Sequence, residues 1–482
     1  MRSRLRKLVR PGASENGAVL VWAAGSLVVL LAFAALSVDL TWLYLNTSRL
    51  QNAADAAALA GVVNLPGFMD KAQEDADAAA AANGYPGGGV ELVPLADNSL
   101  QVVLTTSVPT YLLRIIGFDQ FTIARRSTAQ YIKPVPIGSP DNCFGEAPVS
   151  PPGTACTGGD PNFWAAISGR RTNKFNGDAF ATEFWDDPWS GSHFDNTQYR
   201  PAGYYYGIEV APGSSDLTVH IYDAGFYNRR SLSDETGDRE QDDGGGTDTH
   251  FKMYAPDTTP LDPTDNPPIT GCQFDIPSGY YASTYKNRWA ELCNVSSSLT
   301  PGIYVLRVWT DGTIGGTNQY SVHASVASGS TPHVYGINDI SIFTNQPSTT
   351  SILNLAKVEQ IHAGKRLELH FYDPGEDNGD AYMTVKMPDG TTAQCSWYSE
   401  DEYGNTTTPP GEGGFGACRI QTSDGSPIFN GQWVTANVEI PSSYTCTSNC
   451  WWYMEIELNQ PHDRTTWMAQ IIGNPVRLIA NP

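Results

Sequence analysis

The chain has 482 residues and a formal net charge of −22, with 51 Asp and Glu against 29 Lys and Arg. An acidic chain of this kind repels nucleic acid and anionic lipid, so nucleic acid is excluded as a partner of its charged regions. Aromatic residues make up 11% of the sequence, beside 46 Gly and 33 Pro, which is typical of a turn-rich β protein and not of a disordered chain. The length allows about three domains.

A membrane helix is predicted near the N-terminus. Residues 17–38 carry no charge and are mainly Ala, Val and Leu, and about 20 apolar residues cross the hydrocarbon core of a bilayer. Five Arg and Lys and no acid lie in residues 1–10, a bias that keeps this end in the cytoplasm. A cleaved signal peptide is the alternative, but its apolar run is shorter. We therefore expect a cytoplasmic segment at 1–16, a retained transmembrane helix at 17–45, and extracytoplasmic domains beyond it.

One acid, Asp39, stands near the outer end of this span, before the interfacial aromatics Trp42 and Tyr44. Acids inside a membrane are energetically costly. Two interpretations stay open: the carboxylate reaches the lipid headgroups, or it contacts a partner within a helix bundle.

A small helical and sheet unit follows the span. Residues 46–63 and 68–85 are rich in Ala, which favours helix, and Pro66-Gly67 separates them. Alternating and β-branched residues then predict three strands, at 90–97, 99–109 and 121–132. We expect a helix-plus-small-sheet unit at 46–131, then a Pro/Gly-rich linker at 132–161.

The rest of the chain contains an internal duplication. Residues 204–225 match residues 354–375 at a constant offset of 150, a spacing that indicates duplicated domains and not a solenoid. Strands with alternating apolar residues follow one another without a helical pattern between them, which favours jelly-roll-like β-sandwiches. We expect one sandwich at 162–328 and a second at 334–482. The identical pairs in the repeat are Glu209/Glu359, Leu217/Leu367, His220/His370, Tyr222/Tyr372, Asp223/Asp373 and Gly225/Gly375.

The cysteines predict disulfides. There are eight, all after residue 140, and an even set beyond an outward-facing anchor is typical of disulfide bonding. Two pairs of similar separation follow the repeated strand, and the remaining two pairs are assigned by elimination. Zinc is the alternative, but only one pair is closely spaced. The expected pairs are Cys143–Cys156, Cys272–Cys293, Cys395–Cys418 and Cys446–Cys450.

The N-terminal part resembles a known family. Its residues SENGAVLV, LSVDLTWLYL, RLQNAADAAALAG and VPTYLLRIIGFDQFTIARRSTAQY are similar to those of TadE/TadG-like Flp (Tad) pilus-assembly proteins, over about residues 14–131. The resemblance implies a bitopic, pilin-like protein of a tight-adherence secretion locus, with envelope or pilus proteins as partners. The expected fold class is therefore mostly β with an N-terminal transmembrane α-helix: a pilin-like helix-plus-sheet unit and then two tandem disulfide-stapled β-sandwiches.

Acidic loops are the candidate metal sites. Calcium takes six to eight oxygen ligands from carboxylates, amides and carbonyls on flexible turns, and Asp, Asn and Gly cluster after the repeated strand and again at 234–248 and 262–266. We hypothesise one structural calcium ion in each sandwich; the alternative is a solvated acidic loop. The candidate ligands are Asp223, Asp373, Asp377, Asn378 and Asp380.

Catalytic motifs are missing from the sequence. His220 and His370 occupy equivalent strand positions, but no GxSxG, HExxH or Cys-His signature accompanies them, so a shared hydrogen-bonding role is expected and enzymatic activity is not. A calcium-dependent hydrolase using the acids Asp373 and Asp380 is a minor alternative. Surface glycans are another candidate ligand, through aromatic stacking on Trp185, Trp189, Trp451 and Trp452.

The sequence therefore predicts a membrane-anchored, exported structural or interaction protein whose tandem sandwiches bind other envelope or surface proteins through edge strands and loops. A carbohydrate-binding surface adhesin is the first alternative, and a secreted hydrolase is the second.

Overall fold

The chain forms two compact units in a computed structural model. The anchor unit comprises Met1–Val62, Asp70–Gln130 and Arg477–Pro482, and the head comprises Val63–Met69 and Tyr131–Val476. The structure describes residues 16–65, 69–86, 89–96, 99–131, 135–146, 148–157, 161–169, 172–187, 192–224, 248–259, 262–277, 285–311, 316–344, 350–375, 381–401, 403–409, 412–422, 428–458, 463–472 and 476–480.

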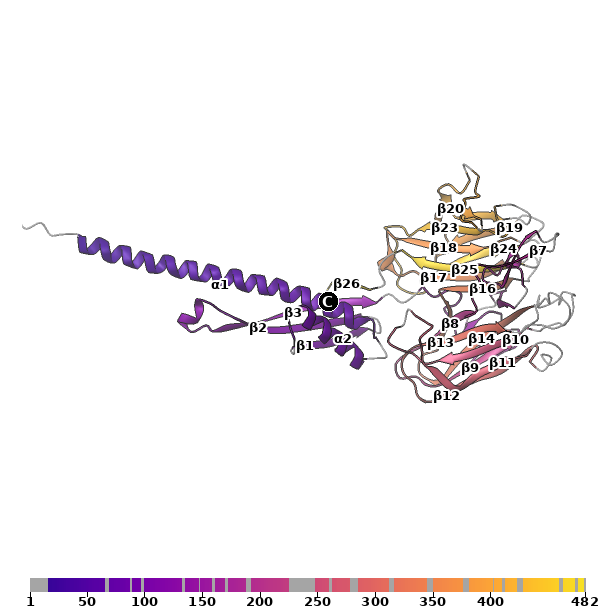
Figure 1. Ribbon diagram of the computed structural model, residues 1–482, viewed down its shortest axis with the longest axis horizontal. Helices are drawn as coiled ribbons and strands as arrows, with labels where there is room; N and C mark the ends of the chain where they lie inside the picture. The colour runs from indigo at the N-terminus through magenta and orange to yellow at the C-terminus, as the bar shows by residue number, and fades with distance from the viewer. Residues whose placement is uncertain are drawn as a thin grey trace, which may run out of the picture. The chain divides into compact units, whose positions relative to one another are not determined.

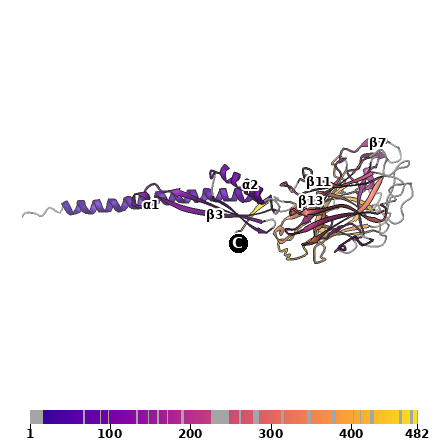
Figure 2. The same ribbon diagram turned by 90° about the horizontal axis from the view of Figure 1, so that it is seen from below.

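The anchor unit is one long helix beside a small sheet. Helix α1 (Asn16–Val62) runs unbroken for 47 residues, from the apolar span into the Ala-rich segment, and α2 (Met69–Ala82) follows it. The sheet has the strand order β1-β2-β3-β26. Its strands are β1 (Val90–Ala96), β2 (Ser99–Pro109), β3 (Gln120–Tyr131) and β26 (Val476–Ile479). The hairpin of β2 and β3 runs along α1 in both views (Figure 1, Figure 2), and its turn contains a 3₁₀ helix, η1 (Leu113–Ile116).

The end of the chain returns to the anchor unit. Strand β26 lies next to β3 in the small sheet, and Arg477 Nη2 donates to Gln130 Oε1 at 2.6 Å. The second sandwich, expected to extend to residue 482, therefore ends before this strand. As a consequence, the head is an insertion between two strands of the anchor sheet.

The first half of the head is an eight-stranded jelly roll. Numbered in chain order, its strands form one sheet of order 1-8-3-6 and a facing sheet of order 2-7-4-5, which is the double Greek key of that fold. The strands are β5 (Trp164–Ser168), β8 (Tyr204–Val210), β9 (Ser215–Asp223), β10 (Asp248–Tyr254), β11 (Pro268–Ile276), β12 (Arg288–Ser298), β13 (Gly302–Asp311) and β14 (Thr317–Ser328). A further hairpin, β6 (Glu183–Asp187) and β7 (Ser192–Asp195), stands outside these sheets, and β15 (His333–Ile337) extends the second sheet beside β8.

The second half repeats this topology. Its sheets have the orders β16-β25-β18-β23-β20-β21 and β17-β24-β19-β22. The strands are β16 (Asp339–Thr344), β17 (Thr350–Lys357), β18 (Arg366–Tyr372), β19 (Ala381–Lys386), β20 (Gln394–Glu400), β21 (Gly416–Ala417), β22 (Arg419–Thr422), β23 (Trp433–Glu439), β24 (Trp451–Glu457) and β25 (Asp463–Ile471). The repeated sequence found at 204–225 and 354–375 therefore covers β8 to β9 in one copy and the end of β17 through β18 in the other.

The two jelly rolls share one sheet. The first strand of each copy, β5 and β16, pair antiparallel, with Phe343 opposite Trp164, so the sheet runs without interruption from β12 to β21. One apolar core extends through both copies and includes Phe251 of the first and Trp467 of the second. The sandwich architecture expected from the sequence is present, but the two sandwiches are fused side by side.

The segment predicted as a linker is packed onto the first jelly roll. We call residues 135–157 the strap. Within it, β4 (Cys143–Phe144) pairs with β14, Val334 N–H donates to Asp141 O at 2.8 Å, and Ala324 N–H donates to Asn142 O at 2.9 Å. The strap is therefore paired with the jelly roll through its backbone and is not a free spacer.

Candidate functional site

The C-terminal half of α1, beyond the apolar span, is rich in small buried side chains. Leu50 and four alanines of the string RLQNAADAAALAG are fully buried, as are three alanines of α2 and Leu100 of β2. Alanine keeps the helix close to its neighbours and has the highest intrinsic helix propensity. Gly61, the last residue of the string, lies so near β2 and α2 that a Cβ on it would be 2.9 Å from Leu100 Cδ2 and 3.0 Å from Ala72 O. The buried alanines are Ala53, Ala54, Ala57, Ala58, Ala72, Ala76 and Ala80.

Replacing Gly61 by Leu should therefore loosen α2 from α1. Overpacking of a tight contact typically costs about 1–3 kcal/mol, so we expect the amide protons of α2 to exchange at least several-fold faster in the full-length protein in detergent. Gly25→Leu is the matched control on the same helix, since nothing lies within 4 Å of its Cβ position. Equal exchange in the two variants would contradict this packing.

Asp39 is held by the turn between β2 and β3. Its carboxylate accepts hydrogen bonds from Tyr111 N–H at 2.8 Å, from Leu112 N–H at 3.0 Å and from Leu113 N–H at 2.6 Å. The side chain is 3% exposed, and the neighbouring Trp42 ring packs edge-on against Tyr111 at 5.3 Å. Within this chain, Asp39 therefore caps the start of η1, an intramolecular role that neither interpretation of the sequence included.

Four disulfides tie the head together, in the pairs expected from the sequence. Cys272–Cys293 joins β11 to β12 of the first jelly roll, and Cys395–Cys418 joins β20 to the residue between β21 and β22 of the second. Closing loops of this length contributes about 3 kcal/mol each in the chain-entropy model. No described cysteine is free. The cysteines are therefore paired in disulfides and are not zinc ligands.

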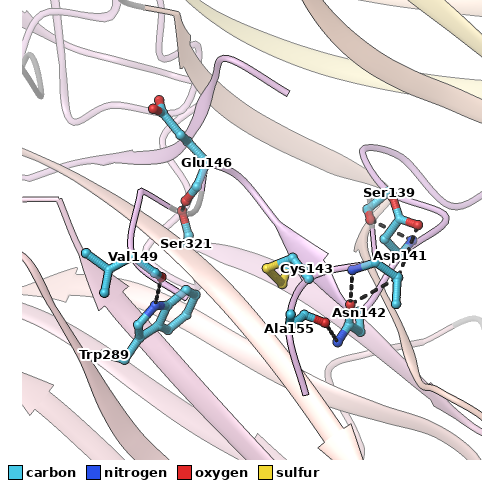
Figure 3. Close-up of a disulfide and its surroundings, with 11 residues drawn as sticks. Ser139, Asp141, Asn142, Cys143, Glu146, Val149, Ala155, Trp289 and Ser321 are labelled. Atoms are coloured by element: carbon cyan, nitrogen blue, oxygen red, sulfur yellow. Dashed lines mark hydrogen bonds between the residues drawn. A yellow bond between two sulfur atoms is a disulfide. The ribbon is translucent and has the colours of Figure 1, made fainter. Parts of the chain in front are cut away.

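The remaining disulfide of the first copy, Cys143–Cys156, closes the strap (Figure 3). Asn142 fastens the loop from inside by accepting from Thr157 N–H at 2.9 Å and donating to Ala155 O at 3.2 Å. The sheet below it supplies Trp289 Nε1–H, which donates to Val149 O at 2.5 Å. The strap is thus bonded both to itself and to the jelly roll.

A histidine pair lies beneath the strap. His323 of β14 is fully buried opposite Cys143, and its ring lies 5.7 Å from that of His220 and 5.8 Å from that of Trp289. Burial, with a smaller contribution from His220, lowers the pKa of His323 to about 4. Burial also lowers the pKa of His220, against the opposing effect of Glu291. Both imidazoles are therefore neutral at pH 7.

Charged side chains are buried where the two jelly rolls meet. Lys174 is fully buried, with its Nζ 5.4 Å from the centre of the Tyr372 ring, and burial lowers the pKa of Lys174 to about 8 against the attraction of Asp373. Arg200 of the first copy forms an ion pair with Asp339 of the second. Burial raises the pKa of Asp339 to about 6, although Arg200 opposes this shift. Lys174 and Asp339 are enclosed, so they are not open to a ligand, whereas Arg200 reaches Asp339 from the surface.

The proposed calcium ligands are not assembled by the described residues. Asp223 and Asp373 occupy equivalent ends of β9 and β18, each 1% exposed, and Asp373 Oδ1 accepts from Gly431 N–H at 2.6 Å. No group of three or more His, Cys, Asp and Glu suited to a metal exists within the part of the chain that the structure describes. The other three candidates, Asp377, Asn378 and Asp380, lie outside it, as does most of the 234–248 loop.

Calcium binding therefore stays a prediction. If the acidic loops hold a structural ion, adding calcium should raise the melting temperature of the purified protein, because a ligand that binds only the folded state stabilises it. The double variant Asp377→Asn/Asp380→Asn should lose that increase. An unchanged melting temperature with the unmodified chain would contradict the prediction.

The repeated histidines differ in their surroundings. His370 Nδ1 lies 3.0 Å from Thr435 Oγ1 and its Nε2 lies 3.0 Å from Glu368 Oε1, an arrangement with the residue types of a hydrolytic triad. Thr435 is 3% exposed, so its hydroxyl is closed to a substrate, whereas a nucleophile needs access. His220 instead contacts His323. His370 therefore forms side-chain hydrogen bonds whereas His220 packs against a ring, so the two positions do not share the hydrogen-bonding role expected from the sequence.

The tryptophans proposed for glycan stacking are core residues where they are described. Trp451 is 8% exposed and Trp452 is fully buried, because consecutive positions of β24 contact the two faces of its sheet. Stacking on these rings is therefore excluded. The side chains of Trp185 and Trp189 lie outside the described part of the structure.

Helix α1 has the length and composition of a membrane span. A window of 18 residues within Val19–Val62 has a mean hydropathy of 2.5, and none of that window is buried in the structure. The uncharged run ends at Asp39, where the small sheet begins to cover the helix. These features support a single-pass membrane anchor.

Three comparisons with known proteins were informative to different degrees, and only the family comparison concerns a defined segment of the chain. No curated protein matches the chain. The crystal structure of peptide-N(4)-(N-acetyl-β-D-glucosaminyl)asparagine amidase is 9% identical and covers 64% of this chain and 100% of its own, with a TM-score of 0.17. The N-terminal tandem CBM22 domain of Xyn10C from Paenibacillus barcinonensis is 9% identical and covers 80% of this chain and 94% of its own, with a TM-score of 0.15. At these TM-scores, neither likeness bears on what this chain does.

The family match falls on the anchor helix. Residues 17–64 match the family model of putative Flp pilus-assembly TadE/G-like proteins, which confirms the resemblance seen in the sequence. The matched segment contains the apolar span, Asp39 and the small buried residues of the Ala-rich part of α1. Over this segment the chain is similar to the TadE/G-like family of putative Flp pilus-assembly proteins, and the same segment contains the helix that is long and apolar enough to cross a membrane.

Proposed function

We propose that this protein is a membrane-anchored component of a Flp-type pilus-assembly system that displays a fused double jelly roll for docking to other envelope or pilus proteins. The observation that carries the proposal is the position of the TadE/G-like match, at residues 17–64. That segment is the helix whose outer half packs on the small sheet, and the head is inserted into the same sheet.

In this proposal the head lies on the extracytoplasmic side. The five basic residues of 1–10 precede the span, and positive flanks stay in the cytoplasm. Four disulfides follow the span, all in the head, and disulfides persist in oxidising compartments. Charge bias and redox chemistry thus support the same orientation.

The proposed role is binding and not catalysis. The buried Thr435 hydroxyl and the enclosed charges at Lys174 and Asp339 are features of a stable scaffold. Exposed large apolar side chains on the second copy, among them Tyr403 at 77% and Phe415 at 62%, offer contact points on the segment between β20 and β22. Such loops on a disulfide-tied frame suit protein recognition.

Excision of the head tests this function. Because the head is inserted between β3 and β26, residues 135–472 can be replaced by a short Gly/Ser linker while the anchor sheet keeps its strands. The excised variant should still insert into the membrane, but piliation or surface adhesion of the producing cell should be lost. Normal piliation and adhesion, with the variant present at the normal level, would contradict the proposal. The double variant Tyr403→Ser/Phe415→Ser tests whether these two side chains form the docking surface. Reduced piliation is expected, and full piliation with that variant would place the contact elsewhere on the head.

A further inference from the structure

The turn between β2 and β3 carries an exposed apolar cluster. We call residues 110–119 the tip. Ile115 is 78% exposed, Ile116 is 69% exposed and Phe118 is 54% exposed, and the tip also exposes Tyr111 and Leu112. Contiguous exposed apolar side chains of this kind mark a contact with a membrane or another protein.

The tip is fixed at the level of the membrane span. Three of its N–H groups bind Asp39, and Asp39 lies six residues before the end of the span predicted at 17–45. At 1.5 Å per residue, this places the tip about 9 Å inside the outer boundary of that span. Both elements belong to the anchor unit, and in Figure 1 the hairpin extends beside α1 toward the apolar end of the helix.

The backbone of the tip is suited to an apolar surrounding. In a bilayer, every backbone polar group needs a partner within the protein. Asp39 accepts from three consecutive N–H groups, and Ile115, Gly117 and Phe118 donate to carbonyls of Leu112, Arg114 and Leu113. Gly117, at φ +94°, closes this turn in the left-handed region. A carboxylate inside a membrane is energetically costly. Asp39 is hydrogen-bonded by the same turn that exposes the apolar residues.

Three side chains at the tip match the interfacial zone, while the exposed Asp119 stands at its C-terminal end. Arg114 is exposed within the apolar cluster, and a guanidinium binds lipid phosphate well. Trp42 and Tyr111 are in ring contact at 5.3 Å, and such aromatics are enriched at membrane–water boundaries.

We propose that the tip inserts into the outer leaflet of the membrane that α1 crosses, as a second membrane contact beside the helix. Two attachment points fix the rotation of α1 about its axis, and therefore which side of the anchor unit faces the lipid. This inference rests on the membrane anchoring of α1, and it is independent of pilus docking by the head.

Depth-dependent quenching tests the insertion. Ile115→Cys is introduced into the full-length protein and labelled with an environment-sensitive fluorophore; no described cysteine is free to compete for the label. The protein is reconstituted in phosphatidylcholine and phosphatidylglycerol vesicles, with or without acyl-chain spin-labelled lipid. We expect at least twofold quenching by the spin-labelled lipid and little quenching by aqueous iodide.

Two labelled positions in the same anchor unit serve as controls. Leu30→Cys, in the span, should be quenched by lipid, and Leu95→Cys, an exposed apolar position on β1, should be quenched only by iodide. A label at Ile115→Cys that behaves like the one at Leu95→Cys would overturn the proposal. Concentration-dependent shielding without lipid quenching would also overturn it, in favour of contact with a second copy. If the label at Leu30→Cys is also unquenched by lipid, the membrane anchoring of α1 is contradicted as well. The Leu30→Cys control therefore distinguishes failure of tip insertion from failure of the anchor itself.

The role of Asp39 is tested with the same label. Asp39→Ala should reduce lipid quenching at Ile115→Cys at least twofold while quenching at Leu30→Cys stays unchanged. Ser37→Ala is the matched control, because its hydroxyl bonds only within α1, to Phe33 O, among the bonds described. Unchanged quenching at Ile115→Cys in the Asp39→Ala variant would overturn the assigned role of this carboxylate in placing the tip.

Discussion

Replacing Gly177 by Ala is expected to lower the free energy of unfolding of the head by about 3 kcal/mol or more. Gly177 has φ +90°, and a Cβ on it would lie 1.8 Å from Arg464 O. The left-handed conformation alone costs an L-residue about 1–2 kcal/mol, and forcing the backbone of β25 away adds an overpacking cost of about 1–3 kcal/mol. Chemical denaturation of the full-length protein in detergent, followed by tryptophan fluorescence, measures the effect.

Gly213→Ala separates the two contributions. Gly213 has φ +82° but nothing within 4 Å of its Cβ position, so only the conformational cost applies. The loop that holds Gly177 is bonded to the second copy, since Thr466 Oγ1 donates to Gly177 O at 3.0 Å and accepts from Ala179 N–H at 3.0 Å. Equal losses in the two variants would mean that this loop does not clamp the two jelly rolls together.

Acidification should destabilise the head through the histidine pair under the strap. The pKa of His323 falls from 6.5 to about 4 in the folded protein. Between these two pH values the unfolded chain binds a proton that the folded chain does not, so stability is full above pH 6.5 and is lost as the pH falls toward 4. At 1.36 kcal/mol per pKa unit, this one residue accounts for a loss of about 3 kcal/mol, and His220 acts in the same direction.

His323→Gln should flatten the pH dependence over that window, whatever its effect on stability at neutral pH. His333→Gln is the control, since His333 is exposed at the end of β15 nearest the strap. Denaturation midpoints of the full-length protein at pH 7, 6, 5 and 4 provide the comparison. If the His323→Gln variant keeps the slope of the unmodified protein, the acid sensitivity of the head belongs to other groups.

Much of the head could be predicted because its signals are local. Alternation of apolar residues in LTVHIYD and LELHFYD indicates strands with one buried face, and these are β9 and β18. The repeat at an offset of 150 predicts two similar sandwiches, and the similar separations of 21 and 23 residues predict the pairs Cys272–Cys293 and Cys395–Cys418. Each inference needed only residues close together, or one repeated pattern.

The features that could not be predicted depend on contacts distant in sequence. Strand β26 has only four residues, VRLI, which are too few to show a periodic pattern. Its neighbour in the sheet, β3, ends at Tyr131, which is 345 residues before β26 begins at Val476. Fusion of the two sheets rests on β5 pairing with β16, and nothing in either strand alone specifies an edge partner. The acceptor role of Asp39 involves backbone groups 72 to 74 residues away.

The anchor was predictable in kind and not in detail. Apolar length and a basic flank indicate a membrane span from composition alone. The string RLQNAADAAALAG resembles the family in sequence, but the structure is needed to show that Ala53 and Ala57 are buried and that Gly61 lies against α2 and β2. The candidate calcium ligands are proposed because their acids are clustered in sequence. Such clustering does not determine whether the carboxylate oxygens come together around one ion.

The most direct test of the central claim is to cross-link the full-length protein in the producing cell's envelope and identify what is joined to the head, with the head-excised variant as the matched control. The account predicts that pilins or secretion-channel proteins are recovered with the full-length chain and lost with the excised one. Recovery of the same proteins from both chains, or of no pilus-assembly protein from either, would contradict docking by the jelly rolls.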